Sequence, residues 1–371
     1  MNMLLTMVQN LLFAGIGIAG VGFLIGFHEL GHFIFCKLFN IHTPSFSIGF
    51  GPRLFEKKIG DTVFALSAIP LGGYVEIAGA AEVGQGEQKE ASRHDERSFS
   101  QKPYWQKMLV MAGGILFNLI FAYATFIILF ATGIPKTPLM YPKNGTTIVH
   151  VVHTDGPAAT STLQPGDKII AINNKHISTL QELLTAIEPL ANTPVTVEVE
   201  RGAEHLSQTI TLGSRDIGTK KIGMFGIEFD SRDLPARSFS EAVKEGIETT
   251  NTLIKNTFFI FKSMFTKKSM ANVGGPLMVI SETIKGAAKG AKIFFLLLAF
   301  ISVNLAVLNI LPLPIMDGGQ ALFYTIEAII RRPLPENVRL YIHYACWIAV
   351  VVLAIYLSFK DIVTLSNNFF K

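Results

Sequence analysis

Four long apolar stretches constrain the fold of this 371-residue chain more than any other feature of its sequence. They cover residues 3–34, 108–135, 293–316 and 340–359, and three exceed the roughly 20 residues that a helix needs to cross a bilayer. One such stretch could be a buried core helix, but four together predict a polytopic α-helical membrane protein with about four transmembrane helices. The first stretch is longer than the apolar part of a signal peptide and follows no Lys or Arg, so we expect a permanent anchor.

The composition also indicates a membrane protein. Hydrophobic residues make up 49% of the chain and charged residues 16%, whereas soluble domains average about 25% charged residues. The formal net charge of +4 is too small to indicate nucleic-acid binding. We therefore expect the lipid bilayer as a partner and no nucleic acid. The two cysteines, Cys36 and Cys346, lie in or beside apolar stretches and predict no disulfide framework.

Basic residues predict the orientation in the membrane. Lys and Arg gather in residues 35–105, between the first two apolar stretches, and in the short connection between the last two. The positive-inside rule places both connections in the cytoplasm. The N-terminus, residues 136–290 and the C-terminus are then expected on the far side.

Three regions outside the apolar stretches have recognisable patterns. Residues 44–78 alternate apolar and polar side chains around a turn at 58–62, which predicts a β-hairpin pressed against the membrane face. Residues 81–102 are polar and predict a loose loop. Residues 239–265 carry apolar side chains at helical spacing, which predicts an amphipathic helix that lies on the membrane surface or serves as a docked linker.

A small α+β domain is predicted between the second and third apolar stretches. Strand-like runs occur at 147–152, 168–172, 195–200 and 207–212, with a helix-like stretch at 180–190. Segments 156–159 and 163–173, which include a Pro-Gly-Asp turn before a strand, resemble the bacterial PDZ pattern. The predicted fold class is thus a helical membrane protein with a membrane-associated β-hairpin region and an inserted PDZ-like domain. Its expected parts are residues 1–135, 145–232, 236–290 and 291–371.

The strongest chemical motif is HExxH, formed by His28-Glu29-Leu30-Gly31-His32. Residues four apart on a helix share one face, about 6 Å apart along the axis, so both imidazoles can bind one metal ion. Glu29 would lie beside the metal as general base for the attacking water. A charged residue at bilayer depth costs about 2.5–3.5 kcal/mol, so we expect Glu29 to be functional. The alternative is an interfacial His/Glu cluster that reaches out to water.

A third metal ligand is expected from Asp317. Catalytic zinc usually has three protein ligands and an open position, and Asp317 is the other acid at membrane depth. Pro312 and Pro314 before it break the helix, and Gly318 and Gly319 after it allow a backbone or substrate to come close. The alternative is that Asp317 caps the start of a helix.

Together these motifs resemble the site-2 protease family of intramembrane zinc metalloproteases, in its bacterial branch, similar to the regulator of sigma-E protease. HExxH in the first stretch, one PDZ-like insert and Asn-x-x-Pro-x-Pro-x-x-Asp-Gly-Gly at 309–319 occur in family order. The resemblance implies one zinc ion per chain, bound by His28, His32 and Asp317, with Glu29 as the base. It also implies a bacterial inner-membrane location, with the active site toward the cytoplasm and the PDZ-like domain outside.

The resemblance implies substrates as well. They would be single-pass membrane proteins, such as anti-sigma factors or signal-peptide remnants, that another protease has already trimmed. The 44–78 hairpin would hold an extended substrate segment by strand addition. The PDZ-like domain would either capture peptides in the same way or exclude substrates with bulky outer domains, and the resemblance favours exclusion.

Three asparagines in the apolar stretches are candidate substrate-binding residues: Asn118, Asn304 and Asn309. Their amides could bond to an unwound substrate backbone, or they could form hydrogen bonds between helices. The family's Gly-x-x-x-Asn feature corresponds to residues 114–118, with Ile115 where many relatives have Pro. The seven remaining histidines, among them His343, have no ligand spacing, and we assign them no role.

Two other functions compete with proteolysis. One is a PDZ adaptor without enzyme activity that holds the C-terminal carboxylates of membrane clients, and the intact HExxH motif with Asp317 argues against it. The other is a zinc carrier or sensor, because acids within the membrane also mark ion paths. A Glu29→Gln variant that binds zinc but cleaves nothing would separate a protease from a carrier.

Overall fold

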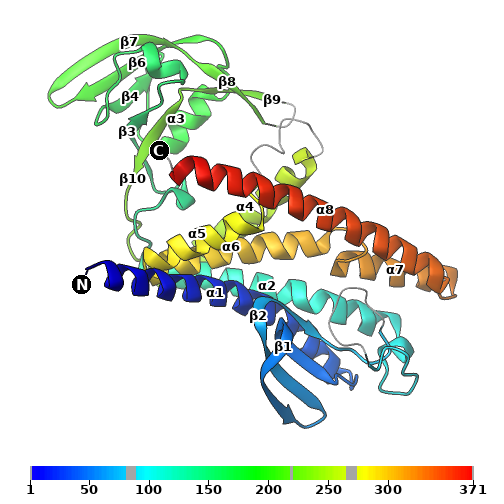
Figure 1. The fold of residues 1–371 in the computed structure, drawn as a ribbon. Coiled ribbons are helices and arrows are strands. Elements are labelled where there is room, and N and C mark those ends of the chain that lie inside the picture. The colour runs from blue at the N-terminus through cyan, green and yellow to red at the C-terminus, as the bar shows by residue number, and fades with distance from the viewer. Residues whose placement is uncertain (1, 81–88, 218–219, 265–273, 370–371) are drawn as a thin grey trace. The chain divides into compact units, whose positions relative to one another are not determined.

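The computed structural model describes residues 2–80, 89–217, 220–264 and 274–369 (Figure 1). The chain divides into two compact units. The helical unit consists of residues 1–129, 239–259 and 272–371, and the β-rich unit consists of residues 130–238 and 260–271. The boundaries of the four parts expected from the sequence stay predictions.

All four predicted apolar stretches are helical. They form α1 (Asn2–Leu38), α2 (Tyr104–Thr132), α6 (Ala291–Ile310) and α8 (Glu336–Phe369). Each contains a segment long and apolar enough to cross a membrane. The third helix ends at Ile310, before the predicted limit at 316, because Pro312 and Pro314 supply no N–H to continue it. The chain becomes helical again at α7 (Asp317–Ile330).

Small residues and one buried acid hold the helical unit together. A Cβ on Gly31 of α1 would lie 2.2 Å from the carbonyl oxygen of Gly113 of α2, so only glycine allows the two backbones to approach this closely. The helix α5 (Pro276–Ala288), which the sequence pattern did not predict, contacts α1, α6 and α8. Buried Asp361 of α8 accepts hydrogen bonds of 2.9 Å from the N–H groups of Gly275 and Met278 at the start of α5. The helix predicted at 239–265 is α4 (Phe239–Met264).

The predicted hairpin consists of β1 (Ser45–Ile59) and β2 (Thr62–Val75), which pair in antiparallel fashion. Its turn lies at Gly60 and Asp61, within the predicted turn. The first part of β1 is enclosed by β2, because residues 45–48 are opposite residues 63–66 and residues 46–48 are also opposite residues 73–75. The strand β2 contacts α1, so the hairpin is fixed to the helix that carries HExxH.

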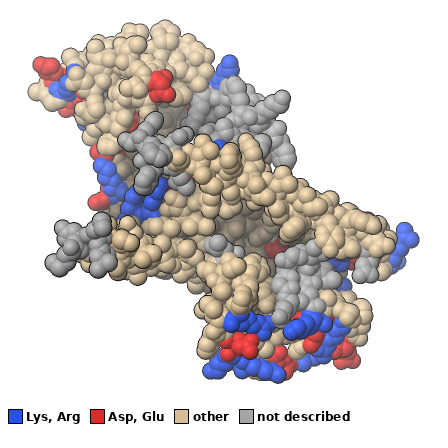
Figure 2. Space-filling model, viewed as in Figure 1, with Lys and Arg blue, Asp and Glu red and all other residues tan. Residues whose placement is uncertain are grey.

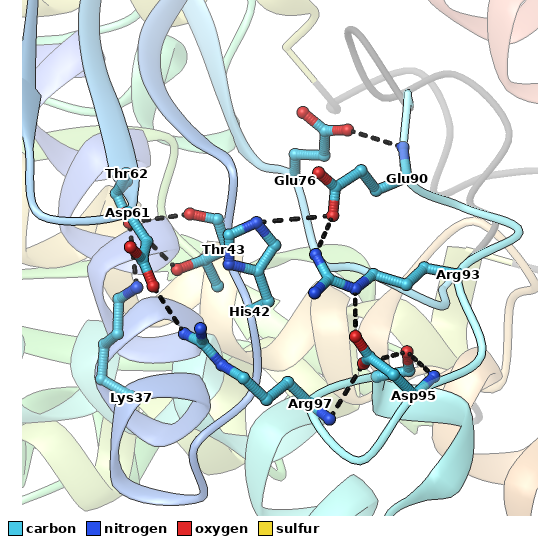
Figure 3. Close-up of polar contacts among 11 residues, drawn as sticks. Lys37, His42, Thr43, Asp61, Thr62, Glu76, Glu90, Arg93, Asp95 and Arg97 are labelled. Carbon is cyan, nitrogen blue, oxygen red and sulfur yellow. Dashed lines mark hydrogen bonds and ion pairs between the residues drawn. The ribbon is translucent and has the colours of Figure 1, made fainter.

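The prediction of a loose loop at 81–102 is wrong for residues 89–102, and residues 81–88 lie outside the described part. Ion pairs fix this connection (Figure 3): Arg93 binds Asp95 at 2.5 Å, and Arg97 reaches Asp61 in the hairpin turn at 2.9 Å. The Arg93 guanidinium holds the pKa of the Asp95 carboxyl below its usual value. One short 3₁₀ helix (Phe99–Gln101) ends the connection before α2. Polarity alone therefore did not mean disorder here.

The β-rich unit contains the predicted α+β domain. Its main sheet has the strand order β10-β3-β4-β6-β7, with β5 paired to β4, and β8 and β9 form a separate pair. The strands are β3 (Gly145–Val152), β4 (Lys168–Ile172), β5 (Lys175–His176), β6 (Pro194–Arg201), β7 (Glu204–Thr211), β8 (Gly213–Ile217), β9 (Lys220–Met224) and β10 (Ile227–Ser231). Leu183 and Ile187 of α3 (Leu180–Ile187) pack into the core with alternate residues of β6, which are Val195, Val197 and Val199.

An ion pair between a buried carboxylate and a partly exposed arginine stabilises this domain. Asp167, in the Pro-Gly-Asp turn, accepts hydrogen bonds of 2.7 and 2.8 Å from Arg201 at the end of β6. The predicted turn thus feeds β4 at residue 168, as the PDZ-like pattern requires. The four strands and the helix predicted from the sequence are present, and the β8–β9 pair and β10 are additions to them.

Candidate metal centre

Three predicted ligands, far apart in the sequence, meet in the helical unit. His28 and His32 lie one turn apart on α1, and Asp317 is the first residue of α7. The two imidazole Nε2 atoms are 3.2 Å apart. Asp317 Oδ2 lies 3.3 Å from His28 Nε2, and Asp317 Oδ1 lies 3.4 Å from His32 Nε2. Within the described residues, this is the one group of three or more His, Cys, Asp or Glu side chains that could hold a metal ion.

The geometry of these donors fits zinc. Zinc bonds to imidazole nitrogen and carboxylate oxygen are about 2.0–2.1 Å long, so the corners of a tetrahedron lie about 3.3–3.4 Å apart. The 3.2 Å between the two imidazole nitrogens is close to that spacing, and each nitrogen lies 3.3–3.4 Å from one of the two Asp317 oxygens. Asp317 Oδ2 is buried and accepts no hydrogen bond from any described residue, which leaves its lone pairs for a cation. Two imidazoles and one carboxylate also match the ligand set of catalytic zinc sites, which keep a fourth position open.

The helix α2 leaves room for an ion beside these donors. Gly114 faces them, and a Cβ at this position would lie 2.4 Å from His28 Cε1 and 2.5 Å from His32 Nε2. Any side chain larger than hydrogen would therefore enter the space between the donors. Glycine at 114 is thus required by the site itself.

Both imidazoles are oriented through their other ring nitrogen. His32 Nδ1 lies 2.8 Å from the carbonyl oxygen of Val110, so an Nδ1–H donates there. The Nε2 atom then keeps its lone pair, which is free to bind a metal ion. His28 Nδ1 lies 3.1 Å from the side-chain amide of Asn118. The amide oxygen of Asn118 is buried and has no partner among the described residues. If the amide is turned so that this oxygen faces His28, it accepts a hydrogen bond from Nδ1–H of His28. His28 then has the same Nδ1–H tautomer as His32.

Asn118 therefore lies beside a predicted metal ligand. It is fully buried, and its backbone carbonyl accepts a 2.8 Å hydrogen bond from Ser302 of α6. The expectation that Asn118 binds a substrate stays a prediction, but the described partner of its side-chain amide is His28. Ser302 and the Val110 carbonyl were not predicted, because contacts between helices leave no local spacing signal in a sequence.

The other two asparagines are not brought to the donors by any described contact. The side-chain oxygen of Asn304 accepts a 3.0 Å hydrogen bond from Thr257 of α4, which is the alternative of a bond between helices. Asn309 is half-buried in the last turn of α6. A role in substrate binding stays a prediction for both.

Glu29 is buried between α1 and the end of β2. Its side chain is 8% exposed, and a Cβ on Gly73 of β2 would lie 3.5 Å from Glu29 Cγ. Glu29 thus follows the predicted ligand His28 in sequence and lies near the end of β2 in space.

The position of Asp317 depends on the segment 311–316 that precedes it. This segment turns on itself through the hydrogen bond from Met316 N to Leu313 O, 2.8 Å long. A Cβ on Gly319 would lie 2.0 Å from Leu313 O, and a Cβ on Gly318 would lie 2.2 Å from Ile310 O. The two glycines after Asp317 therefore let the start of α7 pack against the turn. Asp317 is the first helical residue of α7, and the N-cap position belongs to Met316, so Asp317 does not occupy the capping position of the alternative interpretation. It is a member of the donor group.

Comparisons with known proteins found a matching family model and several relatives. The model of Peptidase family M50 matches residues 16–353. A Clostridium perfringens protein that carries the name zinc metalloprotease is 29% identical, over 92% of this chain and 95% of its own length. One from Agrobacterium fabrum, also named a zinc metalloprotease, is 34% identical over 84% of this chain and 85% of its own. The solved PDZ domain of an SdrC-like protein from Listeria monocytogenes is similar to 23% of this chain, with 87% of that domain covered, 26% identity and a TM-score of 0.20.

Proposed function

The chain belongs to peptidase family M50, the site-2 protease family, and we propose that this multi-pass membrane zinc metalloprotease cleaves its substrates within the bilayer. One observation carries the proposal. His28, Glu29 and His32 all lie within α1, inside the segment Leu5–Leu38 that is long and apolar enough to span a membrane. A buried acid at such a depth is costly unless it has a function. The reacting bond would therefore come to the metal ligands inside the membrane.

The residues of this site would have different roles in the reaction. His28, His32 and Asp317 would hold one zinc ion, which supplies Lewis acidity and favours ionisation of water. The Glu29 carboxylate would take the proton of the attacking water and pass it to the leaving amine. Burial of Glu29 and the ligands excludes bulk water and strengthens these electrostatic interactions.

The substrate would bind as an extended strand along the hairpin. A peptide bond inside a helix has its carbonyl engaged, so a transmembrane substrate must unwind, and each unmet backbone group then costs several kcal/mol. Residues 73–75 of β2 pair with residues 46–48 on one side, and a Cβ on Gly73 would lie 3.5 Å from Glu29 Cγ. A strand added beside this segment would bring its backbone to the base. The proposed substrates are single-pass membrane proteins that another protease has trimmed, such as anti-sigma factors or signal-peptide remnants.

The orientation in a bacterial inner membrane is part of the proposal. Figure 2 shows Lys and Arg, with Asp and Glu among them, gathered on the lower lobe of the view, where the β1–β2 hairpin lies in Figure 1. The strand β1 carries Arg53, Lys57 and Lys58. This supports a cytoplasmic hairpin and an extracytoplasmic PDZ-like domain. Cysteine labels placed in residues 89–100 should react only from the cytoplasm, and labels in 145–230 only from outside. The reverse pattern would disprove this orientation.

The PDZ-like domain would act as a gate that rejects untrimmed substrates. Deletion of residues 145–230 should then allow cleavage of substrates with bulky outer domains, with the zinc content unchanged. If the deletion variant binds zinc but no longer cleaves trimmed substrates, the domain recruits them instead.

A matched pair of proteins tests the cleavage itself. Full-length wild type and Glu29→Gln are produced in the same cells, and membrane peptides are compared by mass spectrometry. We expect fragments cut within transmembrane segments to accumulate with the wild type alone, while metal analysis finds zinc in both proteins. Identical fragments in both samples would contradict proteolysis by this site. Zinc transport that persists in Glu29→Gln without any fragments would indicate a carrier.

A further inference from the structure

A second group of buried polar side chains lies behind the segment that carries Asp317. His343 of α8 is 2% exposed, and its Nε2 lies 2.8 Å from the carbonyl oxygen of Pro314. The side-chain nitrogen of Gln320, on α7, lies 2.9 Å from the same oxygen. Two helices thus direct a polar nitrogen at one carbonyl, three residues before Asp317.

A neighbouring arginine fixes which end of the Gln320 amide faces the carbonyl. Arg339 of α8 donates a 2.8 Å hydrogen bond to Gln320 Oε1 and a 3.0 Å bond to the Tyr324 hydroxyl. Because guanidinium can only donate, the oxygen of the amide must face Arg339 and the NH₂ group must face Pro314. Gln320 is therefore held as a donor to the carbonyl.

His343 belongs to the same group of contacts. Its Nε2 lies 2.8 Å from the Pro314 carbonyl oxygen and 2.7 Å from the side-chain nitrogen of Gln320. In the Nε2–H tautomer His343 donates to the carbonyl, and in the Nδ1–H tautomer it accepts from the Gln320 NH₂ group, so in both forms the imidazole is bonded within this group. The Phe323 ring lies 5.5 Å from the His343 ring, edge to face, and limits the rotation of the imidazole.

This carbonyl belongs to the one part of the site that no regular helix supports. Pro312 and Pro314 end α6, and the segment 311–316 is not helical. Non-helical backbone at membrane depth is tolerated only where protein groups satisfy it. Side chains of α7 and α8 satisfy Pro314, and Asp317 begins α7 directly after this segment.

We propose that His343 and Gln320 are positioning residues that hold the Pro314 carbonyl and thereby keep Asp317 in the geometry of a zinc ligand. The fourth apolar helix is thus coupled to the affinity of the site for zinc. The proposal rests on the proposed metal site and extends it to two residues outside the donor group. Partners of this kind typically change metal affinity by about 10- to 100-fold when they are removed.

Zinc affinity of the purified full-length chain tests the proposal. Each variant is first stripped of metal in detergent, and its dissociation constant for zinc is then measured by competition with a chromogenic chelator. We expect His343→Ala and Gln320→Met each to weaken zinc binding by about 10-fold or more. His343→Gln, which keeps both a hydrogen-bond donor and an acceptor at this position, should recover most of the affinity. Tyr341→Ala, at a 73% exposed position on the same helix, is the matched control and should bind zinc like the wild type.

A purely structural role gives a different result. It would lower the melting temperature of the metal-free variants while their zinc dissociation constants stay within twofold of the wild type, and this outcome would overturn the proposal. If His343→Ala does not fold, Gln320→Met and His343→Gln decide by the same measurement. A wild type that binds no zinc would overturn the metal site and this proposal together. A wild type that binds zinc, with variants that bind equally well, overturns the positioning role alone.

Discussion

Replacing Gly114 by Ala is the sharpest test of the proposed zinc site. The change adds one methyl group to α2, and that group would lie 2.4 Å from His28 Cε1 and 2.5 Å from His32 Nε2. Ordinary contacts of a Cβ begin near 3.4 Å, so the imidazoles would have to retreat by about 1 Å. Metal–ligand distances tolerate only about 0.2 Å of deviation. The substituted site should therefore lose zinc.

The size of the effect follows from that displacement. A misplacement of about 1 Å in a reacting group can lower a rate by about 100-fold. Alanine favours a helix over glycine by about 1 kcal/mol, so the substitution does not weaken α2 through its helix propensity. The expected result is a folded protein with at least about 100-fold lower activity and weaker zinc binding.

The assay compares two glycine-to-alanine changes in the full-length protein. Gly15→Ala, on α1, introduces the same methyl group at a position with no atom within 4 Å, so it should keep both zinc and activity. Zinc content is measured by metal analysis, and activity is measured as cleavage of a trimmed substrate. Folding is checked by the melting temperature. Wild-type zinc affinity in Gly114→Ala would refute the argument that this glycine makes room for the ion.

Further expectations concern single residues in both units. Glu29→Gln should keep zinc but cleave about 10²–10⁴-fold more slowly, as measured with equal metal content. Asn118→Ala should weaken zinc binding by about 10-fold in chelator competition, because His28 loses its orienting amide. If Asn304 binds the substrate, Asn304→Ala should slow cleavage, whereas unchanged cleavage would leave it as a bond between helices worth about 0.6 kcal/mol. In the β-rich unit, hydrogen bonds from Arg201 hold the pKa of Asp167 below its usual 3.8. Hydrogen-exchange protection of β4 should therefore persist above that pH and fall as the pH drops through the lower folded-state pKa.

Local sequence signals predicted those parts of the fold that are set by neighbours along the chain. The four apolar helices, the hairpin turn and the strand at 168–172 depend on composition, spacing or turn residues, and the structure contains them all. The helix α5 and the order in residues 89–102 were missed. The first is anchored by Asp361 of a distant helix and the second by pairs such as Arg97 with Asp61, and neither leaves a local pattern.

The candidate site shows the same limit. The spacing of His28 and His32 predicts a shared face, and the prolines before Asp317 predict the end of a helix, so the three donors could be named from the sequence. The roles of Gly114 and His343 could not be predicted from such local signals. Each acts through a helix that lies remote in sequence from the residues it affects, although a histidine inside an apolar stretch was a usable signal for the second.

The origin of each donor also decides how the site can fail. His28 and His32 are held by regular hydrogen bonds of α1, and they keep their relation wherever that helix forms. Asp317 follows a non-helical turn whose Pro314 carbonyl is bonded by side chains from α7 and α8. Displacement of α8 would therefore move the carboxylate before it moved either imidazole. Loss of the third ligand, with two imidazoles still in place, is the expected first step when the packing of this membrane protein is disturbed.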